Sequence, residues 1–211
     1  MGSTNEASSS WWNHVFLSFR GEDTRRGFTD HLFASLERRG IKTFKDDHDL
    51  ERGKVISVEL MKAIEDSMFA LIILSPNYAS STWCLDELQK IVNCKKEAFP
   101  IFHGVDPSDV RHQRGSFAKA FEEHEEKFRE DKEKVERWRH ALRQVASYSG
   151  WDSKDQYDFS FIITQFYLLF LCYLDQMIWY HHFSRGILEE LNKGILEEFF
   201  YHLTLDLQNI K

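Results

Sequence analysis

The 211-residue chain has few of the residues that mark disulfide-rich, metal-binding or nucleic-acid-binding proteins. Its three cysteines, Cys84, Cys94 and Cys172, are odd in number and lie at no metal-ligand spacing, which predicts a reducing compartment and no metal site. Lysine and arginine total 27 against 34 acidic residues, and this net charge of -7 argues against clustered phosphate contacts. We therefore predict a globular protein without a specific nucleic-acid partner.

The first residues lack the features of a targeting segment. Residues 1–10 are small and polar, without the apolar core of a signal peptide. Glu6 stands where a myristoylation motif at Gly2 requires serine or threonine. We expect residues 1–12 to be disordered and the protein to be cytoplasmic, with the nucleus left open.

Short apolar runs alternate with amphipathic stretches from residue 14 to residue 151. Strands are predicted at 14–19, 41–44, 68–74 and 99–102, and Gly40 is predicted to end the first helix. Residues 105–108 read as a turn. The predicted helices carry Phe28, Leu32, Phe33 and Leu36; Val58, Leu60, Met61 and Ile64; Trp83 to Lys95; Phe117 and Phe121; and Trp138, Leu142 and Val145. This alternation predicts an α/β fold with a five-stranded parallel sheet, order 2-1-3-4-5, and helices on both faces.

The stretch from Leu71 to Leu88 organises the chain. A buried strand ends in a turn at residues 75–77, and Ser80, Ser81 and Thr82 are N-cap candidates for the helix that follows. On that helix Leu85, Leu88 and Val92 share one face. Trp83 and Glu87 share the other, so we expect both to point away from the core; the alternative is a helix-dipole carboxylate beside a packing tryptophan.

Three polar segments are predicted to meet at one crevice. In the order 2-1-3-4-5 the topological switch lies between the first and third strands, where ligands bind at the carboxyl ends of the strands. There Arg20 and Gly21 would face Ser75 and the helix that carries Trp83 and Glu87. The polar loop of residues 45–54 would lie nearby.

The motifs at residues 16–25, 75–88 and 150–151 resemble those of a plant Toll/interleukin-1 receptor (TIR) domain, over residues 13–156. The resemblance implies a flavodoxin-like fold and an enzyme that cleaves NAD+ at its nicotinamide–ribose bond to make nucleotide signals for defence and cell death. NAD+ would be a substrate, with no cofactor. By motif position Glu87 is the catalytic residue. The other implied residues are Arg20, Gly21, Trp83, Ser75, Lys45 and Asp46 for substrate binding, with residues 45–56 as the mobile BB loop, and Asp30 and His31 for self-association and contacts with other TIR-containing immune receptors.

The chemistry of such a site can also be argued from the residues alone. Nicotinamide leaves as a neutral group from a cationic pyridinium, so the reaction needs no general acid, unlike ordinary glycoside hydrolysis with two carboxylates. One carboxylate, Glu87, could stabilise the developing oxocarbenium charge while Trp83 stacks on a ring. Arg20 and backbone N–H groups near Gly21 could receive phosphate.

Parts of the sequence also suggest other functions. A non-catalytic adaptor that only joins TIR partners is the alternative, and cyclic-nucleotide synthesis from nucleic acid is disfavoured by the acidic balance. The sequence contains no P-loop and no leucine-rich repeats, so we do not expect a complete immune receptor. Asp46 and Asp47 resemble the acidic pair of a receiver domain, but Leu74-Ser75 stands where that fold needs an aspartate. Cys84 is expected to be a buried packing residue.

Residues 157–211 differ in composition from the rest of the chain. Thirteen of these 55 residues are aromatic, and the segment has neither turn signals nor clean periodicity. We expect a weakly ordered tail that contributes nothing to the chemistry and derives from an alternative or retained transcript segment. The uncharged run 159–174 is shorter than the ~20 residues of a membrane helix, so association with a membrane through the tail is disfavoured.

Overall fold

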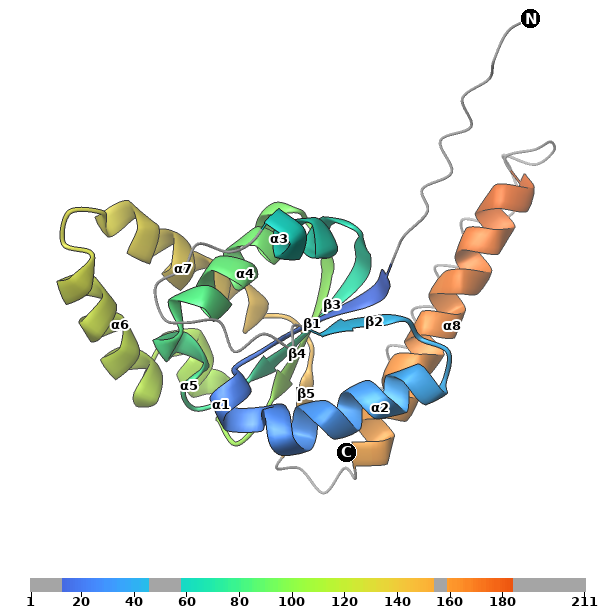
Figure 1. Ribbon diagram of the computed structural model, residues 1–211, viewed down its shortest axis with the longest axis horizontal. Coiled ribbons are helices and arrows are strands. Elements are labelled where there is room, and N and C mark those ends of the chain that lie inside the picture. Colours follow the sequence, from blue (N-terminus) through green and yellow to red (C-terminus); the bar gives the residue numbers. More distant parts are fainter. Residues whose placement is uncertain (1–12, 46–57, 154–158, 184–211) are drawn as a thin grey trace, which may run out of the picture. The chain divides into compact units, whose positions relative to one another are not determined.

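Five strands form one parallel sheet in the computed structural model, which describes residues 13–45, 58–153 and 159–183 (Figure 1). The order is β2-β1-β3-β4-β5, and each neighbouring pair is parallel, which confirms the predicted topology. The strands are β1 (Asn13–Phe19), β2 (Thr43–Lys45), β3 (Ser67–Leu74), β4 (Glu97–Phe102) and β5 (Trp151–Asp152).

The central strands β1 and β3 are apolar on both faces because helices cover both. β3 is buried from Phe69 to Leu74, and β1 is buried from Val15 to Phe19. Their register pairs Val15 with Phe69 and Phe19 with Ile73. Continuous apolar runs of this kind are typical of strands inside a parallel sheet.

One face of the sheet carries most of the helices. Phe16, Ile72 and Leu74 point into a core that includes side chains from five helices. These helices are α3 (Val58–Glu65), α4 (Thr82–Asn93), α5 (Pro107–His112), α6 (Ser116–Lys127) and α7 (Lys132–Val145). On the opposite face lies α2 (Asp30–Arg38), which follows α1 (Gly21–Thr24) and the π-helical segment η1 (Arg25–Thr29) (Figure 1). As predicted, Gly40 follows the end of α2 with a positive φ of 75°.

Two details differ from the sequence predictions. The segment predicted as a turn at 105–108 begins α5, because the Asp106 side chain accepts a hydrogen bond from the Ser108 N–H at 2.7 Å and Pro107 occupies the first turn. Val58, one of the apolar residues that predicted the second helix, is 84% exposed.

The tail contains a long helix. The chain divides into two compact units, residues 1–165 and 166–211, and α8 (Phe159–Phe183) begins in the first. The absence of glycine and proline over these residues permits the helix, and its apolar residues on all sides hide the amphipathic period that would have revealed it. Residues 184–211 lie outside the described structure. In the part of the chain that the structure describes, we find no helix that combines the length and the hydropathy needed to span a bilayer.

Gly150 is required by a close approach between two backbone segments. A Cβ atom at this position would lie 2.3 Å from the Pro100 carbonyl oxygen of β4, closer than any real contact. We expect Gly150→Ala to lower the free energy of unfolding by about 1–3 kcal/mol, because backbone must shift to admit the methyl group. Urea denaturation measures the loss. The exposed neighbour Ser149→Ala is the control, and equal stabilities for the two variants would contradict this account.

Candidate functional site

The predicted catalytic carboxylate, Glu87, is buried rather than exposed. Helix α4 begins as expected at the N-cap Ser81, whose side chain accepts a hydrogen bond from the Cys84 N–H. Glu87, however, is only 4% exposed, which makes the expectation that it points away from the core wrong. The reason is the width of the buried stripe: Cys84 and Ile91 are buried together with Leu85 and Leu88, so the buried face of α4 is wider than the leucines alone indicate and extends to position 87.

Glu87 is buried against a polar residue of β1. The two-residue period of a strand places Ser18 on the same face as Phe16, toward α4. Ser18 is fully buried, and its hydroxyl donates a hydrogen bond of 2.7 Å to Glu87 Oε2. The Ser18 Oγ also lies 2.8 Å from the Tyr78 hydroxyl. A carboxylate can be buried here because a donor from the sheet meets it.

Two further titratable groups surround this hydrogen bond. Tyr78 lies in η2 (Tyr78–Ser80), is fully buried, and its hydroxyl donates to the Cys84 carbonyl at 3.1 Å. Burial raises the pKa of the Tyr78 hydroxyl well above its usual value, and nearby Cys84 and Glu87 raise it further. Burial also raises the pKa of the Cys84 thiol, whose Sγ lies 3.5 Å from the Phe19 carbonyl oxygen. Both groups therefore stay protonated at neutral pH, and Cys84 is a packing residue as predicted.

The residue before Glu87 anchors the other side of α4. Asp86 Oδ1 accepts a 2.7 Å hydrogen bond from the indole N–H of Trp138, a fully buried residue of α7. The ammonium of Lys134 lies 3.6 Å from Asp86 Oδ2. Asp86 thus binds side chains of α7, whereas the adjacent Glu87 binds Ser18 of β1. Together these contacts fix the rotation of α4 about its axis.

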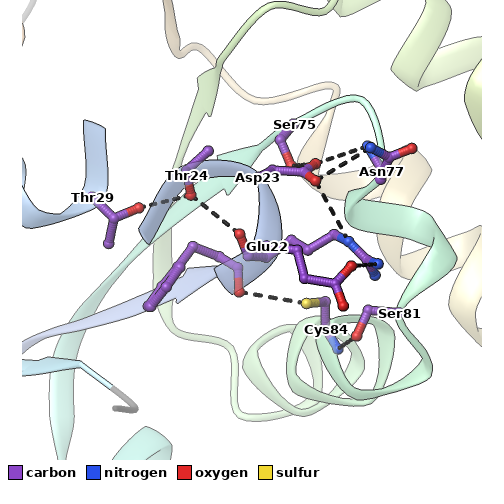
Figure 2. A network of polar contacts seen from close by, with 10 residues as sticks. Glu22, Asp23, Thr24, Thr29, Ser75, Asn77, Ser81 and Cys84 are labelled. Atoms are coloured by element: carbon purple, nitrogen blue, oxygen red, sulfur yellow. Dashed lines mark hydrogen bonds and ion pairs between the residues drawn. The ribbon is translucent and has the colours of Figure 1, made fainter. Parts of the chain in front are cut away.

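The turns that follow β1 and β3 are joined by Asp23. Figure 2 shows the Asp23 carboxylate pointing toward Ser75 and Asn77. Its Oδ2 accepts hydrogen bonds from the Ser75 hydroxyl at 2.6 Å and from the Asn77 N–H at 3.0 Å, and its Oδ1 accepts one from the Asn77 amide at 3.2 Å. Ser75 was predicted to bind substrate, but in this structure its hydroxyl donates its hydrogen bond to Asp23.

The turn of Arg20 and Gly21 lies at the same edge of the sheet. The Arg20 guanidinium pairs with Glu22 at 2.5 Å, and its Nε lies 3.6 Å from Asp23 Oδ1. Gly21 leaves room for Arg25, since a Cβ at this position would lie 2.8 Å from the Arg25 guanidinium. The predicted neighbourhood of Arg20 and Ser75 is thus present, with Asp23 as the link between them.

Trp83 is less exposed than the sequence indicated. It is partly buried and packs against the core on the α4 face of the sheet. Its position in the first turn of α4, four residues before Glu87, is as expected. Its role as a stacking surface for substrate stays a prediction.

The remaining predicted residues lie on or beside α2. The Lys45 ammonium donates to Asp30 Oδ1 at 2.9 Å and lies 4.7 Å from the centre of the Phe33 ring, so its known contacts are with α2. The hydrogen bond from Lys45 lowers the pKa of Asp30. Lys45, which was assigned to substrate binding, is therefore paired with Asp30, which was assigned to self-association. His31 is exposed on the same helix, and Asp46 lies outside the described residues.

The contacts of Ser18, Tyr78 and Asp23 at this site were not predicted from the sequence. Ser18 carried a signal, since it is the one hydroxyl residue inside the apolar run of residues 15–19. Tyr78 and Asp23 carried none, because their roles depend on contacts with residues more than fifty positions away. Within the described part of the chain, no group of three or more histidine, cysteine or acidic side chains could hold a metal ion.

Comparison with known proteins identifies this architecture. The family model of the TIR domain matches residues 13–167. The chain belongs to the TIR domain family. This TIR domain is 54% identical to TMV resistance protein N of Nicotiana glutinosa over 160 residues, which are 74% of this chain and 14% of that protein. It is 57% identical to disease resistance protein RPV1 of Vitis rotundifolia over 145 residues, 67% of this chain and 10% of that protein.

A solved plant structure agrees with the TIR fold. The TIR domains of the activated Roq1 resistosome, described as directly recognising the pathogen effector XopQ, are 51% identical with a TM-score of 0.68, over 73% of this chain and 96% of that one. The domain boundaries predicted at residues 13 and 156 stay predictions. The chain spans only about a seventh or less of the curated relatives that it matches.

The Asp23 contacts generate a stability prediction for this TIR domain. We expect Asp23→Asn to lower the free energy of unfolding by about 1–3 kcal/mol, because an amide nitrogen would replace an oxygen that accepts from the buried Ser75 hydroxyl or from Asn77. Urea denaturation of both proteins gives the difference. Glu22→Gln is the matched control: its carboxylate is 64% exposed, and loss of its pair with Arg20 should cost about 1 kcal/mol or less. A larger effect at Glu22 than at Asp23 would contradict the assignment.

Proposed function

We propose that this TIR domain hydrolyses NAD+ at the nicotinamide–ribose bond, with Glu87 as the catalytic carboxylate. The observation that carries the proposal is a carboxylate, 4% exposed, held by Ser18 beside the topological switch between β1 and β3. Ligands of open parallel sheets bind at this edge. An acidic side chain is buried at cost to stability, and such costs are characteristic of functional sites.

The proposed reaction needs few groups. The electron pair of the C1′–N1 bond leaves with the pyridinium ring, which departs as neutral nicotinamide, and positive charge develops on the ribose. Water then adds to C1′ and loses a proton, so NAD+ and water give ADP-ribose, nicotinamide and a proton. A carboxylate in low-dielectric surroundings stabilises the developing cation more strongly than one in water. Cys84 and Tyr78, kept protonated by their raised pKa values, add no competing negative charge beside Glu87.

Arg20 is the proposed phosphate ligand. The ion pair of Arg20 with Glu22 is partly exposed to solvent, because the Glu22 side chain is 64% exposed. Ion pairs of this kind contribute about 1 kcal/mol or less to stability. A pyrophosphate could replace Glu22 at this guanidinium with little loss. Trp83, Gly21, Ser75, Lys45 and Asp46 complete the proposed substrate site.

We further propose that the domain acts in plant immune signalling and is active when self-associated. Sequence similarity to plant disease resistance proteins, and to the TIR domains of a resistosome, supports this role. The proposed surface includes Asp30 and His31 of α2, and other TIR-containing immune receptors are its proposed partners. Lys45 restrains Asp30 on this surface and joins it to the end of β2.

Replacement of the carboxylate tests the catalytic proposal. We expect Glu87→Gln to lower nicotinamide release from NAD+ at least about 100-fold, since the amide keeps the size of the side chain but cannot stabilise a cation by charge. Chromatographic assay of nicotinamide measures the rate. The isosteric change is preferred to alanine because position 87 is buried.

Glu122→Gln on α6 is the control for this experiment, because Glu122 is exposed and should leave the rate unchanged. A folded Glu87→Gln protein that retains most of the activity would refute the catalytic assignment. A wild-type chain that releases no nicotinamide at any concentration would favour the alternative, a non-catalytic adaptor.

Dependence on assembly is tested by dilution. We expect specific activity to rise with protein concentration, and His31→Ala to raise the concentration of half-maximal activity about fivefold, as for an interface residue worth ~1 kcal/mol. Activity measured across a dilution series, with light scattering to report mass, gives both quantities. Lys119→Ala, an exposed change on α6, is the control. Constant specific activity down to monomeric protein would exclude this dependence.

A further inference from the structure

Ser18 is a polar residue in a place built for an apolar one. Its neighbours Phe16, Leu17 and Phe19 are buried, and Ser18 itself is fully buried. A hydroxyl in such surroundings is destabilising unless it is hydrogen-bonded. Valine or alanine would fill the position without that cost, so the contacts of the hydroxyl are the feature to be explained.

The contacts of Ser18 form an ordered chain of donors. A serine hydroxyl has one proton, and Ser18 donates it to Glu87 Oε2 at 2.7 Å. Tyr78, 2.8 Å away, must then be the donor toward Ser18, and it shares its proton with the Cys84 carbonyl. The raised pKa of Tyr78 keeps that proton in place. Each donation polarises the next hydroxyl, so Tyr78 strengthens the hydrogen bond from Ser18 to Glu87.

Another buried serine shows what a purely structural hydroxyl does here. Ser67, at the start of β3, is 1% exposed and donates to the Ala63 carbonyl at 2.7 Å, which ties the strand to the end of α3. Ser18 instead contacts two side chains, Glu87 on α4 and Tyr78 in η2. Its hydrogen bonds therefore position functional groups of other elements rather than close a local backbone turn.

We propose that Ser18, supported by Tyr78, is a positioning residue that holds the Glu87 carboxylate in its working orientation. The inference rests on the proposed role of Glu87 in NAD+ cleavage, and it assigns supporting roles in that reaction to Ser18 and Tyr78. Because β1 is an interior strand, paired with both β2 and β3, Ser18 couples the carboxylate to a part of the sheet that is held on both sides. A donor on Oε2 also favours the ionised form of the carboxyl group, which is the form that stabilises a cation.

Three variants test this inference with NAD+ as substrate. We expect Ser18→Ala to lower kcat about 10- to 100-fold with KM nearly unchanged, and to move the acidic limb of the kcat profile to higher pH, because the carboxylate loses its donor. Tyr78→Phe should act in the same direction, by about 3- to 10-fold, since it removes only the support behind Ser18. Ser67→Ala is the control and should leave kcat and its pH profile as in the wild type.

A second measurement separates this inference from the function on which it rests. In protein labelled with ¹³C at the glutamate carboxyl carbons, the Glu87 signal is assigned by its absence in Glu87→Gln and is titrated in the wild type and in both Ser18→Ala and Tyr78→Phe. A higher pKa of Glu87 in these variants is expected, whether or not NAD+ is cleaved. Failure of the wild type to cleave NAD+ would reject the proposed function alone.

Two results would overturn the positioning role itself. One is a folded Ser18→Ala protein with the kcat, pH profile and Glu87 titration of the Ser67→Ala control. The other, decisive if Ser18→Ala does not fold, is a Tyr78→Phe protein whose profile and titration match the wild type.

Discussion

The parallel pairing of β1 with β3 is the constraint on which the candidate site depends. Parallel strands end at the same edge of a sheet, so this register brings the turn of Arg20 beside the turn of Ser75. Asp23 then joins the two turns through three hydrogen bonds. The same pairing places Ser18 beneath α4, where its hydroxyl meets Glu87. Without this pairing neither the contact between the two turns nor the buried carboxylate would form.

Helix α4 adds the proposed catalytic carboxylate to this arrangement of strands. Asp86 binds Trp138 of α7, while Glu87 binds Ser18 of β1, so consecutive residues fix the helix against the two elements on either side of it. A buried carboxylate is costly, and an apolar residue at position 87 would pack at less cost. A residue that packs less favourably than an apolar one, as Glu87 does, is expected where function rather than stability determines the residue.

Much of the fold could be predicted from the sequence because local signals agree with the global structure. Apolar runs located the strands, Gly40 ended α2, and Ser81 capped α4. The placement of Arg20 and Ser75 at one edge of the sheet was predicted, whereas the roles of these residues and of Glu87 stay proposals. The orientation of Glu87 could not be predicted from the sequence. Leu85 and Leu88 indicate which face of α4 is buried, but the width of that face depends on tertiary neighbours. Asp23 and Tyr78 depend on pairs distant in sequence, and α8 has no amphipathic period to detect.

The central claim is that the carboxylate held by Ser18 faces the ribose of NAD+. The most direct measurement is a crystal structure of the Glu87→Gln chain with NAD+ bound, in which slow cleavage preserves the substrate. The account predicts the nicotinamide ribose beside the side chain at position 87, with a ribose oxygen at hydrogen-bond distance, about 3 Å, from it. A nucleotide bound away from the α4 edge of the sheet, or with its adenosine rather than its nicotinamide ribose at position 87, would contradict it.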